Sequence, residues 1–376
     1  MLHSSKPTPQ LQNLTCGRLA PSPTGVLHVG NARSLLLAWL SARSAHGRIL
    51  LRIEDLLPDA DVHLPGLLRD LAWLGVDWDP PQANDSWQAA PPVHVDGRAV
   101  IGLLRQSTRT PLYADLLARL HARGEAYPCL CTRKDIDGAA RAPHAEDRGT
   151  PYPGTCRGRY ASEAEALAVE LQRAEREGRP PLGVAWRLRV PDAPVHFDDR
   201  LLGLQAVDLP ADSGDVVVRR KDGGFAYMFA VVVDDLAMGV TEVVRGDDLL
   251  GATGQQLAVY AALSRIQARP GDPLADLLER ARVQPPPHHA HVPLVLGDDG
   301  RRLAKRNRSL HLHDLRQAGV EPGQLRRWLA VSCGLPETDD LGEMVAAFAW
   351  DRLPRRPVRF GEIERQDLLV GLQKPL

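Results

Sequence analysis

A histidine and a glycine, His28 and Gly30, stand where a helix is expected to begin, three and five positions after the turn sequence Pro-Ser-Pro-Thr-Gly of residues 21–25. Free backbone N–H groups at the start of a helix form a ready site for phosphate. We expect His28 to donate a hydrogen bond to a phosphate oxygen as charge develops there, and Gly30 to let a purine ring approach the backbone. A capped turn without a ligand is the alternative for His-x-Gly alone, but the rigid turn before it favours ATP chemistry.

Three of the five cysteines are close together in the sequence. Cys129 and Cys131 are separated by one residue, and Tyr152-Pro-Gly-Thr-Cys156 follows. Three thiolates at this spacing predict a structural Zn²⁺ site, and a closed tetrahedral site requires a fourth ligand. Tyr152, His144 and water are the candidates for that ligand. Three buried or free thiols are the alternative, whereas the odd number of cysteines argues against a disulfide framework.

The elements that would position these residues alternate between strand and helix in the first half of the chain. Residues 16–20 and 48–53 have strand patterns. Residues 31–46 have a helical apolar face, and Gly47 is expected to cap that helix. This order predicts a parallel α/β sheet, in which ligands bind at the carboxyl ends of the strands. The further expected elements are helices at residues 64–74, 112–123, 161–177 and 253–263, and strands at residues 186–190, 215–220, 230–235, 242–245 and 292–296.

Composition and charge exclude several classes of protein. The 376 residues carry a net charge of −1, so any nucleic acid must be contacted through local patches. The sequence has no run of 18 apolar residues, which argues against a membrane-spanning helix. Residues 1–14 are polar and lack the apolar core of a signal peptide, so we expect a flexible leader on a cytoplasmic protein. No coiled-coil repeat is evident, and a monomer is the default expectation.

Four segments of the chain together resemble the class I glutamyl-tRNA synthetases. They are Gly17-Arg-Leu-Ala-Pro-Ser-Pro-Thr-Gly-Val-Leu-His-Val-Gly30, Arg52-Ile-Glu-Asp55, Phe225-Ala-Tyr-Met-Phe-Ala-Val-Val-Val-Asp-Asp235 and Gly239-Val-Thr-Glu-Val-Val-Arg-Gly-Asp-Asp248. In addition, Arg302-Leu-Ala-Lys-Arg306 lies where that family carries its lysine-bearing loop, with Ala304 in place of the usual serine. The resemblance covers most of residues 16–312.

This resemblance implies a two-step reaction. Glutamate attacks the α-phosphate of ATP, which is bound with Mg²⁺; pyrophosphate leaves, and the glutamyl-adenylate passes its glutamyl group to an RNA acceptor. Lys305 is expected to stabilise charge on the pyrophosphate, with a solvated or RNA-binding basic run as the alternative. The residues that match the family's glutamate site are Arg18, Ala20, Ser22, Glu54, Tyr227 and Arg245. Those that match its ATP site are His28, Gly30, Asn31 and Lys305, of which His28, Gly30 and Lys305 would be catalytic.

The chemistry of the matched side chains suits glutamate, because two carboxylates and one ammonium group must be held. Arg18 and Arg245 can each offer a planar guanidinium to a carboxylate. Tyr227 and Ser22 can donate hydrogen bonds, and Glu54 can pair with the α-ammonium. A surface ion pair is the alternative for any one of these residues, but their common position at strand ends or in loops of one sheet favours a site.

A narrower resemblance follows from the zinc-site sequence and from the length of the chain. Tyr152-Pro-Gly-Thr-Cys156 is similar to a subgroup in which the tyrosine is a zinc ligand, and about 65 residues follow Ser309, too few for an anticodon-binding domain. The chain therefore resembles the glutamyl-queuosine tRNA(Asp) synthetases, which are similar to truncated glutamyl-tRNA synthetases. That family implies activation of L-glutamate without tRNA and transfer to queuosine at the wobble position of tRNA(Asp), in an unpaired loop suited to recognition by protein.

The expected fold is α/β, with a class I synthetase Rossmann-like parallel sheet, an inserted zinc-bearing subdomain and a short stem-contact-like region at the C-terminal end. The expected boundaries are a leader at 1–14, the catalytic domain at 15–125 and 205–285, the inserted acceptor-type subdomain at 126–204, and the signature-loop and stem-contact-like region at 286–376. Residues 79–98 and 269–287 are expected to be solvent-exposed insertions without an assigned role.

Three other functions remain open from the sequence. The first is a conventional glutamyl-tRNA synthetase without its anticodon domain. The second is a catalytically silent RNA-binding paralogue, suggested by Asn31 in place of a histidine and by Ala304. The third is a nucleotidylyltransferase, which shares the His-x-Gly turn but leaves the two arginines and the cysteines without a purpose.

Overall fold

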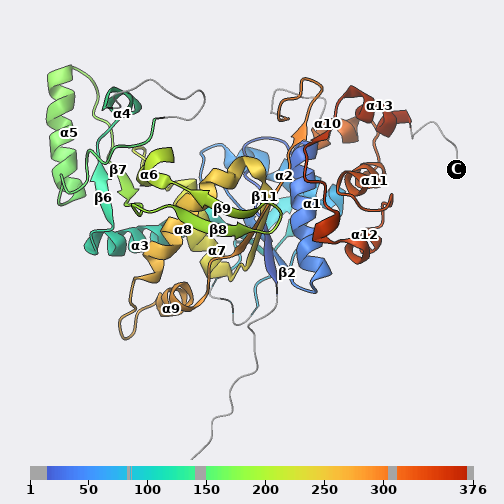
Figure 1. Ribbon diagram of the computed structural model, residues 1–376, viewed down its shortest axis with the longest axis horizontal. Helices are drawn as coiled ribbons and strands as arrows, with labels where there is room; N and C mark the ends of the chain where they lie inside the picture. Colours follow the sequence, from blue (N-terminus) through green and yellow to red (C-terminus); the bar gives the residue numbers. More distant parts are fainter. Residues whose placement is uncertain (1–14, 83–84, 86, 140–149, 304–310, 371–376) are drawn as a thin grey trace, which may run out of the picture.

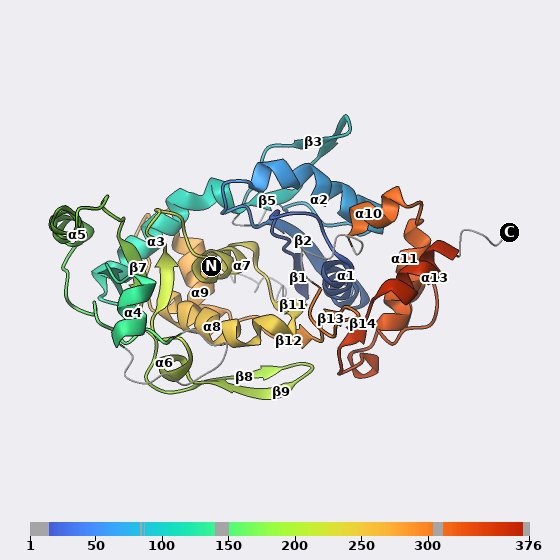
Figure 2. The same cartoon turned by 90° about the horizontal axis from the view of Figure 1, so that it is seen from above.

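A parallel sheet lies in the middle of the protein, and its strands come from both halves of the chain. The computed structural model describes residues 15–82, 85, 87–139, 150–303 and 311–370. One set of parallel strands has the order β1 (Cys16–Leu19), β2 (Arg48–Ile53) and β5 (Leu103–Arg105). The other set pairs β11 (Glu242–Gly246) with β12 (His288–Val292). The N–H of Thr241 donates to the oxygen of Cys16 at 2.9 Å, so β11, which lies in the middle of the molecule in Figure 1, is beside β1, as the labels of Figure 2 show. The predicted parallel α/β sheet is therefore confirmed.

Helices cover both faces of this sheet. Successive residues of a strand point to opposite faces, and in β2 the side chains of Leu51 and Ile53 join one apolar cluster while Leu50 joins another. The first cluster includes α1 (Val29–Ser44) and α2 (Ala60–Leu74). The second cluster includes α3 (Thr110–Ala122), α7 (Tyr227–Met238), α8 (Leu250–Ser264) and α9 (Ala275–Val283). Because both faces are covered, nearly every residue of the central strands is buried, including the charged Arg18, Arg52 and Arg245.

The expectation of a strand at residues 230–235 is wrong, because these residues belong to helix α7. The segment is apolar and β-branched, and such a run has no period that distinguishes a buried strand from a helix that is buried all round. Val231, Val232 and Val233 are each at most 2% exposed, although they point in different directions around the helix. Tertiary packing therefore overrides local propensity here, and the helix ends at Gly239 in the left-handed conformation, with φ of 68°.

The role predicted for Gly47 as a helix cap is also wrong. Helix α1 ends at Ser44, and the residue with left-handed backbone is His46, with φ of 52°. Gly47 is instead required by a close approach between two chain segments. A Cβ atom on Gly47 would lie 2.2 Å from the main-chain oxygen of Thr15, where the chain enters β1.

The expected boundary at residues 204 and 205 is not followed by the strands. One antiparallel sheet consists of β10 (Val216–Arg219), β7 (Ala185–Leu188) and β6 (Ala126–Cys129). The hairpin of β8 (Val195–Asp199) and β9 (Gly203–Val207) instead joins β12 of the central sheet, with Asp199 paired to His289. The segment before residue 204 therefore contributes strands to both sheets, and so does the segment after it. The helices near them are α4 (Arg133–Ala139), α5 (Glu163–Glu177) and α6 (Leu209–Asp212).

The last part of the described chain packs against α1 and α2 (Figure 2). Its elements are β13 (Val295–Leu296), which pairs with β14 (Val358–Arg359), and the helices α10 (Leu312–Gln317), α11 (Pro322–Ser332), α12 (Leu341–Ala347) and α13 (Glu362–Val370). Arg33 of α1 is 1% exposed and donates to the main-chain oxygens of Pro293 and Ser332 at 2.7 and 3.0 Å. The strand expected at residues 292–296 is thus divided at Pro293, which has no N–H to donate.

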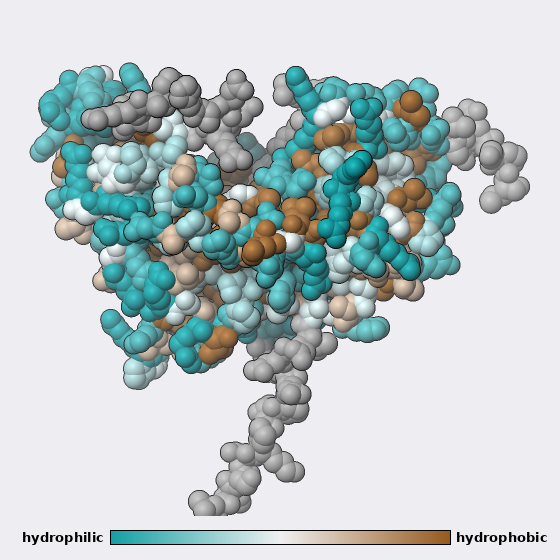
Figure 3. All heavy atoms as spheres, viewed as in Figure 1, coloured by the Kyte–Doolittle hydropathy of each residue, from teal (hydrophilic) through white to brown (hydrophobic). Residues whose placement is uncertain are grey.

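The two expected insertions are more ordered than solvent loops. Residues 269–287 contain α9, whose Leu277 and Leu278 are buried in the second cluster. Residues 79–98 contribute the buried Trp87 and most of the hairpin of β3 (Val93–Val95) and β4 (Arg98–Val100). On the face shown in Figure 3, brown colour gathers over the β8–β9 hairpin, where Leu204 is 72% exposed. No helix in the described part of the chain is long and apolar enough to cross a membrane.

Candidate active site

A cavity of about 670 Å³ opens where β1 and β11 lie side by side. From β1 the chain crosses through α1 to β2, and from β11 it crosses through α8 to β12 on the other side. Such a reversal of strand order leaves a crevice at the carboxyl ends of the strands, which is where α/β proteins bind ligands. The cavity is lined by nine of the residues predicted from the sequence, namely Arg18, Ala20, Ser22, His28, Gly30, Asn31, Glu54, Tyr227 and Arg245. Lys305 lies outside the described residues.

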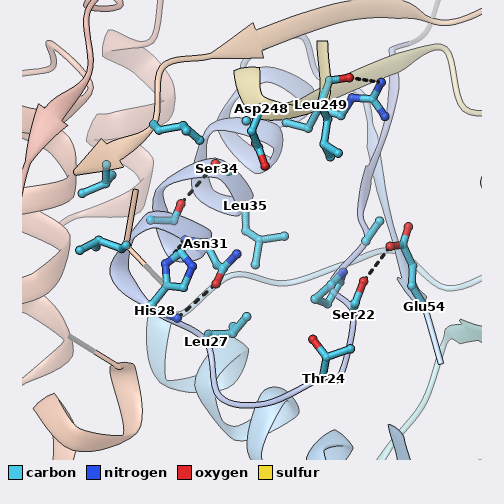
Figure 4. A pocket seen from close by; sticks show the side chains of 18 of the residues that line it. Ser22, Thr24, Leu27, His28, Asn31, Ser34, Leu35, Glu54, Asp248 and Leu249 are labelled. Atoms are coloured by element: carbon cyan, nitrogen blue, oxygen red, sulfur yellow. Dashed lines mark hydrogen bonds between the residues drawn. The ribbon is translucent and has the colours of Figure 1, made fainter. Parts of the chain in front are cut away.

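His28 and Asn31 bind each other at the start of α1 (Figure 4). The Nδ1 atom of His28 accepts a hydrogen bond from the N–H of Asn31 at 3.2 Å, and Oδ1 of Asn31 accepts from the N–H of His28 at 3.3 Å. Because Nδ1 is an acceptor, the proton of the neutral ring is on Nε2. Burial, together with the charges of Arg302 and His311, lowers the pKa of His28 to about 4. At neutral pH His28 is therefore a neutral donor that lines the cavity.

Gly30 is held against the imidazole ring of His28. A Cβ atom on Gly30 would lie 3.0 Å from both Nδ1 and Cε1 of His28 and 3.5 Å from Cβ of Val295. The group that packs closely against Gly30 is therefore the ring of His28, which caps the same helix. A side chain here would push the ring away from the N–H of Asn31.

Glu54 follows β2 and is held from two sides. Its Oε2 atom accepts from the hydroxyl of Ser22 at 3.0 Å, and its Oε1 atom lies 3.3 Å from Nη2 of Arg52. Arg52 also binds the buried carboxylate of Asp235 on α7, and Asp235 lies 3.7 Å from Nε of Arg18. Burial raises the pKa of Glu54, while Arg52 opposes that rise. The carboxylate shares one arginine with Asp235 and so keeps its capacity to bind a cation.

Arg245 is 6% exposed and is surrounded by neutral acceptors. Its Nε donates to Nε2 of His291 at 3.1 Å, and its Nη2 donates to the hydroxyl of Thr253 at 2.7 Å. Its Nη1 donates to Oε1 of Gln256 at 2.9 Å. Within the described residues, no carboxylate forms an ion pair with Arg245. Burial lowers the pKa of this guanidinium. A buried cation without a carboxylate is costly, so this arrangement favours an anionic ligand.

Several residues around the cavity were not identified from the sequence. Thr253 and Gln256 lie three positions apart on α8 and so share one face of that helix. His289 and His291 lie two positions apart on β12 and so share one face of that strand. These spacings indicate the faces but not the elements that pack against them. Asp248 and Arg302 both line the cavity and form an ion pair with each other. Sequence spacing could not have indicated that pair, because 54 positions separate the two residues.

The three clustered cysteines and Tyr152 surround one point in the inserted region. The Sγ atoms of Cys129, Cys131 and Cys156 lie within 4.8 Å of one another. The hydroxyl of Tyr152 is 3.4 Å from Sγ of Cys129, and the Sγ atoms of Cys131 and Cys156 are 3.6 Å apart. Zinc–sulfur bonds of about 2.3 Å in a tetrahedron place sulfur atoms about 3.8 Å apart, so these donors fit Zn²⁺.

The charges around the cysteines also suit a cation-binding set. Hydrogen bonds from the thiols of Cys131 and Cys156 lower the pKa of Cys129, and the hydrogen bond with Cys129 raises the pKa of Cys131, so without a cation the cluster favours one thiolate. The guanidinium carbon of Arg187 lies 3.8 Å from the centre of the Tyr152 ring and offsets the negative charge. His144, an alternative fourth ligand, lies outside the described residues. Tyr152 is therefore the described side chain that completes a four-donor set with the cysteines.

Comparison with known proteins gives one consistent result. The family described as tRNA synthetases class I (E and Q), catalytic domain, matches residues 16–270. A glutamyl-Q tRNA(Asp) synthetase of Nitratidesulfovibrio vulgaris is 44% identical over 95% of this chain and 98% of its own length. One of Symbiobacterium thermophilum is 42% identical over 92% and 96%. A protein named glutamate–tRNA ligase 2, from Alkalilimnicola ehrlichii, is 37% identical over 91% of this chain but 65% of its own length.

The solved structures agree on the fold. The crystal structure of a glutamate tRNA ligase from Elizabethkingia meningosepticum, in complex with its amino acid, has a TM-score of 0.62 at 22% identity. It covers 95% of this chain and 69% of that one. The glutamate–tRNA synthetase of Elizabethkingia anophelis has a TM-score of 0.63 at 22% identity and covers 95% and 70%.

Proposed function

Because the chain belongs to the class I tRNA synthetases of the glutamyl and glutaminyl type, and among them to the glutamyl-Q tRNA(Asp) synthetases, we propose that it activates L-glutamate with ATP and glutamylates queuosine. Activation occurs without tRNA. The acceptor is queuosine at the wobble position of tRNA(Asp). The observation that carries the proposal is one cavity in which two arginines, a tyrosine and a buried glutamate meet the capped start of a helix.

The cavity offers complementary groups for each charge of glutamate. Arg18 and Arg245 bind carboxylates, and Tyr227 adds a phenolic hydrogen bond. Glu54, oriented by Ser22, binds the α-ammonium group. The absence of a carboxylate around Arg245 among the described residues supports the binding of an acid rather than an amide.

In the first step, a carboxylate oxygen of glutamate attacks the α-phosphorus of ATP. The new bond joins this oxygen to phosphorus, the bond to the bridging oxygen breaks, and pyrophosphate leaves with that electron pair. His28 donates from Nε2 to a phosphate oxygen, and the free N–H groups at the start of α1 add to this stabilisation. Asn31 holds the histidine ring, Gly30 leaves space for it, and Lys305 neutralises charge on the pyrophosphate, which Mg²⁺ accompanies.

In the second step, a hydroxyl of the cyclopentenediol ring of queuosine attacks the carbonyl carbon of the glutamyl-adenylate. An ester forms, AMP leaves, and the hydroxyl proton is released. An unpaired base at the wobble position can enter a cleft without the cost of opening a duplex. The names of two relatives that match this chain over nearly their full length support this acceptor.

We also propose that the chain holds one structural Zn²⁺ through Cys129, Cys131, Tyr152 and Cys156. The short distances among these donors support the assignment. The ion would fix the turn after β6 (Ala126–Cys129) and the turn before α5 (Glu163–Glu177). Because the apolar cluster of this region is small, the metal would supply part of its stability.

Two assays test the function. ATP–pyrophosphate exchange is measured with glutamate, glutamine or aspartate in the absence of RNA, and we expect exchange with glutamate alone. Radioactive glutamate is then supplied with tRNA(Asp) from cells that make queuosine and from cells that do not, and the nucleosides are analysed by mass spectrometry. Glutamyl-queuosine is expected only with the first tRNA. Exchange that requires tRNA(Glu), with glutamate on its 3′ end, would instead indicate a conventional glutamyl-tRNA synthetase.

A further inference from the structure

Behind Arg245, two buried side chains form a hydrogen-bonded series that leads away from the cavity. His291 of β12 and Asp199 of β8 are 0% and 3% exposed. Nε of Arg245 lies 3.1 Å from Nε2 of His291, and Nδ1 of His291 lies 2.6 Å from Oδ2 of Asp199. Neither His291 nor Asp199 lines the cavity. Nε2 of His291 also lies 3.1 Å from the hydroxyl of Thr253, which does not line the cavity and itself accepts from Arg245. The described contacts therefore connect Asp199 and His291 to the cavity through Arg245.

The surroundings of Asp199 fix the orientation of its carboxylate. Oδ1 accepts from the N–H groups of Leu201 and Leu202 at 3.0 and 2.9 Å, in the turn between β8 and β9. Oδ2 accepts from the N–H of His291 at 3.1 Å as well as from its ring. All of these neighbours are donors, so the site requires a carboxylate, which only accepts.

The carboxylate in turn decides which ring nitrogen of His291 carries the proton. Nδ1 must donate to Asp199, so Nε2 of the neutral ring is left as an acceptor. Nε of Arg245 is always a donor, and the two atoms therefore attract each other. If the proton were on Nε2 instead, it would face the N–H of Arg245, and the ring could donate to the hydroxyl of Thr253 but could no longer accept from Arg245.

We infer that Asp199 and His291 are positioning residues for Arg245, which they hold in the orientation that receives a carboxylate of the substrate. The inference rests on the proposed function. In it, Asp199 and His291 are the pair that sets the selectivity of the enzyme for an acid. The imidazole separates the two charges, so Asp199 orients Arg245 without forming an ion pair with it. An aspartate in direct contact would neutralise the guanidinium and compete with the substrate.

Exchange of Asp199 for asparagine tests the inference most directly. The Asp199→Asn amide keeps its oxygen on the N–H groups of Leu201 and Leu202, where it also lies 3.3 Å from the main-chain N–H of His291, and presents NH₂ to Nδ1 of the ring. Nδ1 of His291 must then accept a hydrogen bond, so the ring proton moves to Nε2. There it faces the N–H of Arg245. In ATP–pyrophosphate exchange, we expect the KM for glutamate to rise about 10- to 100-fold, as for other residues that orient a binding group. The KM for ATP should stay within about twofold.

A rescue variant separates orientation from general structure. In His291→Gln, the amide oxygen takes the place of Nε2 and accepts from Arg245 without help from Asp199. The KM for glutamate should change about threefold or less, and adding Asp199→Asn in this background should have little further effect. His291→Phe, which keeps a ring but has no acceptor, should raise the KM as much as Asp199→Asn. Equal effects of Asp199→Asn in both backgrounds would overturn the inference.

Nitrogen NMR of ¹⁵N-histidine-labelled protein gives a readout that does not depend on activity. The His291 signals are assigned by their loss in His291→Gln. The wild type should show a protonated Nδ1 and an unprotonated Nε2, and Asp199→Asn should exchange the two states; a protonated Nε2 in the wild type refutes the inference. If the wild type shows no glutamate-dependent exchange, the proposed function fails, whereas the NMR result still decides how Arg245 is held. Thermal unfolding identifies any variant that does not fold, in which case His291→Gln and His291→Phe decide the outcome.

Discussion

Nη1 of Arg18 donates a hydrogen bond to the main-chain oxygen of Val244 at 3.3 Å. This contact brings the guanidinium of β1 against the strand that carries Arg245, although 226 positions separate the two bonded residues. Both arginines line the cavity, and the charge of Arg18 adds to burial in lowering the pKa of Arg245. An anion between them relieves this repulsion, which gives a physical reason for an acidic substrate.

The first prediction concerns that charge. Arg245→Gln should raise the KM for glutamate about 100-fold or more, because a hydrogen bond to a charged group contributes about 1.5–3 kcal/mol and the charge itself is lost as well. The KM for ATP should change little. Initial rates of ATP–pyrophosphate exchange at varied glutamate and saturating ATP measure the effect. Arg265→Gln, which removes an exposed arginine paired with Glu125, is the matched control and should leave both constants unchanged.

The second prediction concerns the start of α1. Gly30→Ala places a Cβ 3.0 Å from the His28 ring, so the ring must move away from the N–H of Asn31. We expect the KM for ATP to rise several-fold and kcat to fall, with little change in glutamate affinity. Gly66→Ala is the control. Gly66 lies in α2 with nothing within 4 Å of an added Cβ, so that variant should be about 1 kcal/mol more stable and fully active. Normal ATP kinetics in Gly30→Ala would contradict the role of the ring.

The third prediction concerns pH. Asp70 is 1% exposed, and burial raises its pKa from 3.8 to about 6, although Arg316 opposes the rise. Between these values the folded state keeps a proton that the unfolded state has released, so stability falls as pH rises through this window. Relative to Asp70→Asn, the wild type should lose up to about 3 kcal/mol of unfolding free energy between about pH 4 and pH 6 and no more above it. Urea unfolding of both proteins across this range gives the difference, and a constant difference would refute the shift.

The fourth prediction concerns the metal. Purified protein should contain one Zn²⁺ per chain by elemental analysis, and Cys131→Ser should lose it and unfold at lower temperature. Tyr152→Phe should keep the ion with weaker affinity, measured by competition with a chelator. Cys16→Ala changes a buried cysteine outside the cluster and should keep the full zinc content. An unchanged affinity in Tyr152→Phe would assign the fourth position to water or to His144.

The sequence predicted most of the structure that depends on neighbours along the chain, although the helix cap expected at Gly47 was wrong. The turn before His28, the helix after it and the strand at residues 48–53 follow from local spacing, and the structure has them there. The predicted glutamate-site residues also meet in one cavity, because each stands at a strand end or helix start that the α/β order brings to one edge of the sheet. At residues 230–235 the type of element was predicted wrongly, because an apolar run has the same pattern in a buried helix as in a buried strand.

The amino-acid sequence by itself determined nine of the residues that line the cavity, through segments that match a known family, and the donors that could bind zinc, through their types and spacing. Only the tertiary structure decided that Arg245 has neutral partners, that Arg18 lies beside it, and that Asp199 sets the proton of His291. The contacts of Arg18 with Val244, of Arg245 with His291 and of His291 with Asp199 join residues 46 to 226 positions apart. The charge and orientation of a buried group depend on what packs around it, and that is decided when distant strands and helices close on one another.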